Sequence, residues 1–159
     1  MSILSFFEWC ESTAIGQAIR SSLWLFPVIE SVHLLALALI GGAILLVDLR
    51  LLGLGLRRQP AAELARDAQR WLTGGLAVMI VTGLLLFSSE ALKCYYNQAF
   101  WIKMSALGPA IVFAFTVRRK VAAAEEGTIR PVWRKMTAAV SIGLWLVVAA
   151  SGRWIGFSG

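Results

Sequence analysis

The chain contains a single histidine, His33, which follows Glu30 by three residues within the apolar stretch FPVIESVHLLALALIGG. Residues at this spacing share one face of a helix. In a low-dielectric environment, a neutral imidazole can bind a metal through one ring nitrogen while a neighbour orients the other nitrogen. The spacing therefore indicates a candidate cofactor or metal site, with His33 as the metal ligand and Glu30 as a site residue.

Three further ionisable residues, Glu90, Lys103 and Arg153, lie near the outer ends of other apolar stretches. A charged side chain inside a membrane costs roughly 2.5–3.5 kcal/mol on insertion scales, and it usually faces the interior of the bundle. Together with Glu30, these residues place two acids and two bases at a similar depth. A buried charge network that orders the helices is therefore the alternative to a cofactor site.

The number of histidines limits which cofactors are compatible with the chain. One histidine is too few for a closed zinc site, but heme iron can be held by a single histidine. Lys103, Arg153 or Arg50 could then meet the heme propionates. We expect heme b, with copper as the alternative. The soft sulfur residues are scattered and form no closely spaced copper motif; they are Met79, Cys94, Met104 and Met136.

These residues must be positioned by helices in a membrane. The chain has 159 residues, of which 58% are hydrophobic and only 15% are charged. An apolar run of about 20 residues can cross the hydrocarbon core as a helix, and four runs qualify, at 23–47, 72–89, 99–117 and 137–154. The runs are continuous rather than alternating, which argues against a β-barrel. The sequence predicts one all-α domain over residues 1–159, an integral membrane four-helix bundle.

The N-terminal stretch LSFFEWCESTAIGQAIRSS carries apolar residues at helical spacing, which predicts a short interfacial helix before the first span. Cys10, in this stretch, and Cys94 both fall on the expected outer side. A disulfide between them is possible in an oxidising compartment. The pair Gly152 and Gly156 would allow close helix contact, so a homo-oligomer or a larger membrane complex is a possible partner.

The basic residues predict the orientation. They gather in the loops that follow the first and third spans, as Arg50, Arg57, Arg58, Arg66 and Arg70, and then as Arg118, Arg119, Lys120, Arg130, Arg134 and Lys135. The positive-inside rule places both loops in the cytoplasm and both termini in the periplasm, across a bacterial inner membrane. Attraction to anionic lipid headgroups accounts for the net charge of +6. No nucleic-acid partner is expected.

Three stretches resemble the cores of two membrane families, the copper-resistance D family and the bacterial heme-binding membrane protoporphyrinogen oxidases. They read HLLALALIGGAILLVDLRLLG, RWLTGGLAVMIVTGLLLF and NQAFWIKMSALGPAIVFAFTVRRK. The shared elements are His33, Gly41-Gly42, Arg50, Thr82-Gly83-Leu84, Trp101 and Lys103. The resemblance covers roughly residues 30–120. It implies that His33 is a heme ligand and Lys103 a second site residue. Asp48 stands where the oxidase pattern has proline. The chain also resembles a group of small four-helix membrane proteins of the same pattern.

Three functions follow as hypotheses. The first is a heme b protein that transfers electrons or oxidises a porphyrin-like or quinol-like substrate. The second is a copper-handling or small-solute transport protein in which Glu30, Lys103 and Arg153 line a cavity. The third is a structural accessory subunit without catalysis. Whether the protein is an enzyme, and which residues would be catalytic, stays open at this point.

Overall fold

The computed structural model describes residues 2–54, 59–124 and 127–157, and these residues contain helices and turns but no strand. The long helices are α3 (Leu25–Leu52), α4 (Ala61–Ser89), α6 (Gln98–Phe113) and α8 (Pro131–Phe157). The third of these continues as η1 (Ala114–Arg118), a π-helix, and α7 (Arg119–Ala123). Within the described residues, four continuous helical stretches are long and apolar enough to cross a membrane. The predicted all-α helical bundle is confirmed, and the chain is a multi-pass membrane protein. Arg57 and Arg58 lie outside the described residues.

The helices extend beyond the apolar runs that predict them. The first ends at Gly53, whose φ of 82° provides a left-handed C-cap. The second begins at Ala61, directly after Pro60, because the Ala-, Glu- and Arg-rich segment that precedes its apolar run also favours a helix. The third continues to Ala123. Arg118 therefore lies on a membrane helix, not in the loop where the sequence suggested it.

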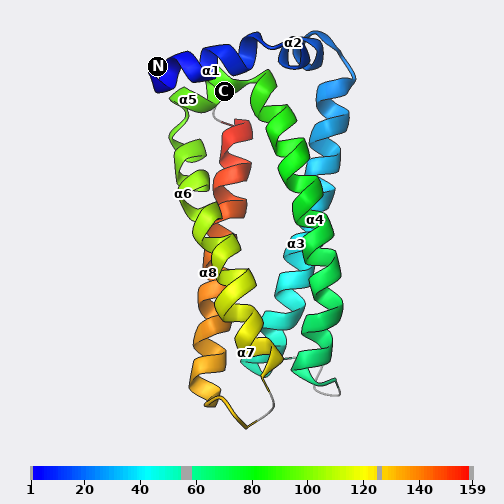
Figure 1. Ribbon diagram of the computed structural model, residues 1–159, viewed down its shortest axis with the longest axis vertical. Coiled ribbons are helices and arrows are strands. Elements are labelled where there is room, and N and C mark those ends of the chain that lie inside the picture. The colour runs from blue at the N-terminus through cyan, green and yellow to red at the C-terminus, as the bar shows by residue number, and fades with distance from the viewer. Residues whose placement is uncertain (1, 55–58, 125–126, 158–159) are drawn as a thin grey trace.

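The N-terminal segment forms two helices, α1 (Ile3–Ser12) and α2 (Ala14–Ser21), where the sequence predicted one. Thr13 separates them, because its hydroxyl accepts the Gly16 N–H at 3.2 Å and begins a new helix. Figure 1 shows both helices lying across one end of the bundle, beside α5 (Ala91–Tyr96) and near both chain termini. We call this the capped end, and the opposite end the α7 end.

The long helices pack as two hairpins, α3 with α4 and α6 with α8, which are joined by contacts between α3 and α8. Toward the capped end α3 lies apart from α6 and α8, and at the opposite end α7 meets α4 (Figure 1). Burial follows this arrangement. On α3, every buried residue lies between Ala36 and Leu51, and on α6 no residue from 100 to 109 is buried.

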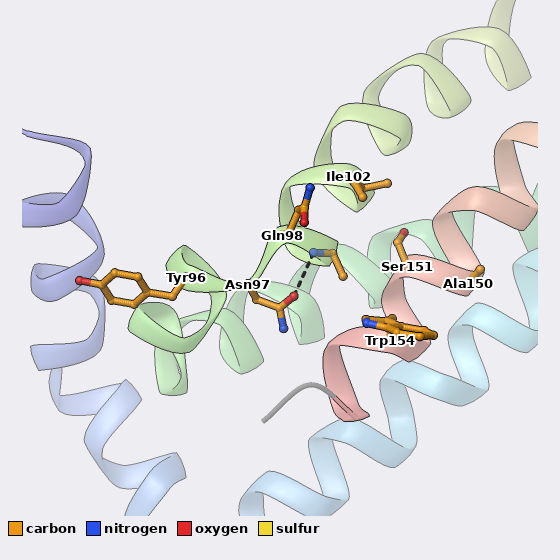
Figure 2. Close-up of a pocket in the computed structure, with 8 residues that line it drawn as sticks. Tyr96, Asn97, Gln98, Ile102, Ala150, Ser151 and Trp154 are labelled. Carbon is orange, nitrogen blue, oxygen red and sulfur yellow. Dashed lines mark hydrogen bonds between the residues drawn. The ribbon is translucent and has the colours of Figure 1, made fainter.

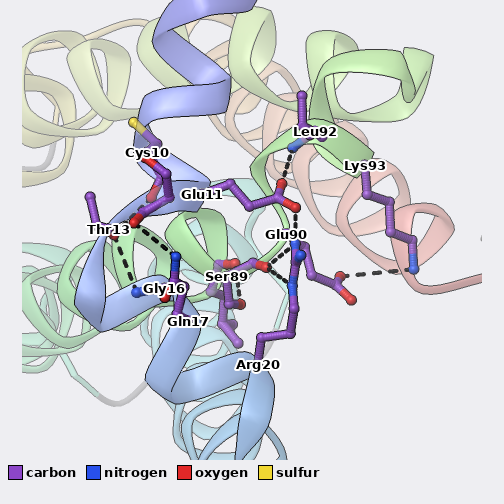
Figure 3. A network of polar contacts seen from close by, with 12 residues as sticks. Cys10, Glu11, Thr13, Gly16, Gln17, Arg20, Ser89, Glu90, Leu92 and Lys93 are labelled. Atoms are coloured by element: carbon purple, nitrogen blue, oxygen red, sulfur yellow. Dashed lines mark hydrogen bonds and ion pairs between the residues drawn. The ribbon is translucent and has the colours of Figure 1, made fainter.

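A polar network holds the N-terminal helices on the capped end (Figure 3). Arg20 donates to the Ser89 carbonyl from Nε at 3.0 Å and from Nη2 at 2.8 Å, and it also pairs with Glu11. The second carboxylate oxygen of Glu11 accepts the Leu92 N–H at 2.7 Å. Beneath this network, Gly16 lies so close to the Ser88 carbonyl oxygen that a Cβ would be only 2.3 Å away. These contacts position α2 against the end of α4.

Candidate cofactor site

His33 is half-buried on α3 and faces α4. Its Nδ1 lies 2.9 Å from Thr82 Oγ1. The Thr82 hydroxyl lies 2.7 Å from the Val78 carbonyl of its own helix and 3.3 Å from the Met79 carbonyl, and it donates its one hydrogen to them. With that hydrogen committed, Thr82 Oγ1 can only accept from the imidazole.

This hydrogen bond assigns the tautomer of His33. Nδ1 must carry the proton, and the neutral ring then presents the lone pair of Nε2. Thr82 thus does what the partner of a metal-bound histidine ordinarily does, which is to fix the ring and leave the other nitrogen available for coordination. The sequence had suggested Glu30 for this role.

Two glycines let side chains from opposite hairpins approach the helices. A Cβ on Gly83 would lie 3.3 Å from His33 Cε1, so the imidazole rests directly on the backbone of α4. A Cβ on Gly152 would lie 3.4 Å from Lys103 Nζ, so the ammonium rests on α8. Lys103 is half-buried and close enough to His33 to interact with it electrostatically. The structure therefore brings these two predicted site residues into one region, from α3 and α6.

The other predicted site residues are Glu30, Arg50 and Arg153, of which Arg153 directly follows Gly152 on α8. Glu30 is exposed on α3 and forms no ion pair with Lys103. Arg153 is exposed on α8. Arg50 donates from Nε to the Gln59 carbonyl at 2.9 Å, in the connection between α3 and α4. Seventeen residues separate it from His33, about 25 Å along a helix, so Arg50 and His33 cannot contact the same side of one small cofactor.

The charge network offered as the alternative is not formed as expected. Glu90 pairs with its helical neighbour Lys93 at 3.8 Å, and both side chains are 40% exposed. An ion pair with that much exposure contributes little to stability. Lys103 forms no ion pair with either of the two acids within the described residues.

Cys10 and Cys94 are both free thiols, and they pack in or against one small cluster around Phe7. Burial raises the pKa of Cys10. Burial, followed by the charge of Glu90, raises the pKa of Cys94 to about 11. At neutral pH both are therefore thiols rather than the thiolates that bind soft metals or attack disulfides.

A groove of about 470 Å³ lies beside the Lys103–Gly152 contact, between the start of α6 and the end of α8 (Figure 2). Ile102 and Ser151, the sequence neighbours of that contact, line it together with Trp154. The Ser151 hydroxyl donates to the Val147 carbonyl at 2.6 Å, and the Asn97 side chain accepts the Ala99 N–H at 2.9 Å. These two polar groups are therefore engaged close to their own positions in the chain.

A second polar centre lies toward the α7 end. Arg118 donates from Nε to Asp48 Oδ1 at 2.7 Å and from Nη2 to the Ile44 carbonyl at 3.0 Å. Asp48 is fully buried and Arg118 is 4% exposed. The Ser141 hydroxyl lies beside the carboxylate, but its Oγ and Asp48 Oδ2 both lack a hydrogen-bond partner at ordinary geometry within the described residues. The pair ties α3 to the end of the third membrane helix.

The sequence showed only half of this second centre. Asp48 stood out as an acid in an apolar run, but its partner was counted among the basic loop residues. The π-helical turn η1 carries the third helix past that expected boundary and ends at Arg118. A π-helical turn is a local irregularity that apolar periodicity does not predict. The signal that could have found Arg118 is the requirement that a buried carboxylate be paired.

Comparison with known proteins gives one match. Residues 6–158 match a family of unknown function, DUF6644. The chain belongs to this family. The match spans nearly the whole chain, so the described helices, with both His33 and Asp48, lie within the family's domain. No curated protein and no solved structure matches the chain significantly.

Proposed function

We propose that the protein binds heme b in the capped half, between the α3–α4 and α6–α8 hairpins, where His33 Nε2 would hold the iron. The observation that carries this proposal is the hydrogen bond from His33 Nδ1 to Thr82, which leaves Nε2 as the lone-pair donor. The resemblance to heme-binding membrane oxidases, through His33 and Lys103, supports the same choice.

Three residues would have separate roles in heme binding. Thr82 orients the imidazole, and Gly83 lets the ring lie close to the backbone of α4. Lys103 approaches from the opposite hairpin, where its ammonium would pair with a heme carboxylate. On α3 no residue before Ala36 is buried, and on α6 no residue from 100 to 109 is buried, so fewer side chains are packed in this half than in the other. When bound, heme supplies reversible one-electron chemistry, which suits electron transfer or oxidation of a quinol-like or porphyrin-like substrate.

A copper-handling function receives less support. Within the described residues, no three His, Cys, Asp or Glu side chains are grouped as shared metal ligands would be. The two cysteines are held as protonated thiols. A single histidine with an oriented ring suits a macrocycle, which brings its own four ligands, better than a free ion that needs several from the protein.

The orientation forms part of the proposal. Most of the described basic residues, such as Arg66, Arg70, Arg118, Arg119, Arg130 and Arg134, belong to the elements and connections at the α7 end, whereas the start of α1 and the end of α8 lie toward the capped end (Figure 1). By the positive-inside rule, the α7 end faces the cytoplasm of a bacterial inner membrane, and the heme lies nearer the periplasmic side.

The test is an absorption spectrum of detergent-purified protein together with metal analysis of the same sample. We expect a Soret band and iron in the wild type, and loss of both in His33→Ala. Glu30→Gln is the matched control, since Glu30 is an exposed residue one turn earlier on the same helix, and it should keep the band. Lys103→Arg should retain heme, because it preserves the charge, whereas Lys103→Met should weaken binding.

Other outcomes point to the competing functions. A colourless wild type with stoichiometric copper would overturn the heme proposal in favour of metal handling. A colourless and metal-free protein, expressed with adequate heme supply and folded equally well with Ala at position 33, would favour a structural subunit.

A further inference from the structure

A second groove, of about 730 Å³, opens at the α7 end between the first turns of α4 and helix α7. Its polar rim includes Arg66, Arg70 and Arg119, with Gln69 and Thr73 next to them. The groove is far from His33 and takes no part in the proposed heme site. It concentrates positive charge in a concave surface, unlike the general spread of basic residues along the loops.

Of the four arginines that line this groove, Arg118 is bonded to Asp48, whereas the other three are largely uncommitted. Arg66 and Arg119 are exposed, and neither forms a hydrogen bond or an ion pair within the described residues. Arg70 meets Asp67 at 3.7 Å, but the two side chains are 83% and 74% exposed, so this pair is weak and easily opened. An anion entering the groove would meet several guanidinium groups and displace little existing structure.

The remainder of the lining is small and apolar. Ala65, Gly74 and Ala122 lie along the groove and leave room beside the two helices. Gly74 has no atom within 4 Å of the position where a Cβ would stand. Arg66 and Arg70 precede the apolar stretch of α4, while Arg119 follows that of the third membrane helix, so the rim lies where lipid headgroups are found. A charged rim above a small-residue channel matches a phosphate group attached to an apolar tail.

We infer that this groove is a binding site for a phosphate group, and that an anionic phospholipid headgroup is its occupant. Arg66 and Arg119 would bind the phosphate oxygens from two helices, since guanidinium groups recognise phosphate by charge-assisted hydrogen bonds. The glycerol and the start of an acyl chain would lie along the small residues. Basic pockets between membrane helices at the cytoplasmic surface commonly bind such headgroups.

The experiment uses the full chain in a nonionic detergent and native mass spectrometry with equimolar phosphatidylglycerol and phosphatidylcholine. We expect the wild type to retain phosphatidylglycerol preferentially, and Arg66→Gln/Arg119→Gln to lose about 10-fold or more in affinity. The matched control is Arg130→Gln/Lys135→Gln, which removes the same charge at exposed positions outside the groove. The control should change affinity by less than about 2-fold.

Further measurements distinguish a lipid headgroup from a soluble phosphate compound and test whether the groove is the binding site. Displacement of the bound lipid by millimolar glycerol phosphate or inorganic phosphate would support the phosphate site and assign it to soluble phosphate compounds. Retention of the lipid under those conditions supports a lipid site. Equal losses in the groove and control variants, or equal binding of the two lipids by wild type, would overturn the inference. Arg66→Lys/Arg119→Lys keeps the charge, and it should bind phosphatidylglycerol nearly as well as the wild type. This variant tests the site even if the double glutamine variant misfolds.

Discussion

Asp48 and Arg118, in the α7 half, are bonded to each other and sealed from their surroundings, whereas His33 and Lys103, in the capped half, are half-buried and share no hydrogen bond. In both pairs, one residue comes from each hairpin. The first pair closes the bundle where apolar side chains are most completely buried. The second lies where the hairpins stand apart, and its groups keep their capacity to bind something else.

The difference shows how a membrane bundle can hold charge for two purposes. A carboxylate and a guanidinium neutralise each other and can be buried together, at the cost of removing both from water. An imidazole and an ammonium cannot neutralise each other. Two such groups within electrostatic range of each other are understandable where a ligand supplies electron pairs or negative charge. This contrast leads us to assign structure to the α7 half and binding to the capped half.

The largest effect should come from breaking the buried pair. Asp48→Ala leaves the Arg118 guanidinium buried without its partner, which should lower the free energy of unfolding by about 3–5 kcal/mol. Titration with a denaturing detergent measures this loss. Asp67→Ala, which removes the exposed pair with Arg70, should cost less than about 1 kcal/mol.

The double variant Asp48→Leu/Arg118→Met sharpens the same comparison. Replacing both charges with apolar side chains should recover most of the stability that Asp48→Ala loses. If the double variant is as unstable as the single one, the centre does more than join the helices, and the assignment of a purely structural role to the α7 half is wrong.

The packing of the α7 half is tested by substitutions at two neighbouring glycines on α4. A Cβ on Gly75 would come within 2.9 Å of Ile40 Cγ1, whereas a Cβ on Gly74 would meet nothing within 4 Å. Gly75→Ala should therefore reduce stability by about 1–3 kcal/mol through overpacking. Gly74→Ala should be neutral or stabilising, because alanine favours the helix. Similar losses in both variants, measured by the same detergent titration, would contradict the close approach of α3 and α4.

Substitutions in the capped half should change heme binding rather than stability. Thr82→Val removes the acceptor for His33 Nδ1 while keeping the shape of the side chain, and it should weaken heme binding by about 10–100-fold. Thr82→Ser restores the hydroxyl and should restore most of the affinity. The readout is the heme content and the position of the Soret band. Unchanged heme binding in Thr82→Val would show that the hydrogen bond does not set the ring for coordination.

The features of this molecule differ in how clearly the sequence predicts them. Apolar runs of bilayer length predict the membrane helices, and Pro131 is the first residue of the last one, a position that suits proline. His33 and Lys103 are visible because charge in an apolar run is costly. Their partners are not visible in this way, since Thr82 resembles any helical threonine and Arg118 resembles a loop arginine. Pairing between helices depends on rotation and register, which composition does not determine.

The smallest effect concerns the helices that cover the capped half. Partial burial acts to raise the pKa of Glu11, but the hydrogen bond from Leu92 and the hydrogen bond and charge of Arg20 together outweigh it and lower the pKa below 4.5. A carboxyl group whose pKa is lowered in the folded state stabilises that state above its unfolded pKa, and this contribution is lost as the pH falls through the folded value. The attachment of α1 and α2 should therefore be complete near neutral pH and weaken only below about pH 4.

Hydrogen exchange of the N-terminal helices, measured as the pH is lowered, tests this attachment once the data are corrected for the intrinsic pH dependence of exchange. Glu11→Gln should loosen α1 and α2 at neutral pH and remove most of the acid dependence. Glu8→Gln is the matched control, because Glu8 is exposed on the same helix, and it should behave as the wild type does. If Glu11→Gln leaves exchange unchanged while heme loss still accelerates in acid, the pH sensitivity lies in the capped half itself rather than in the helices that cover it.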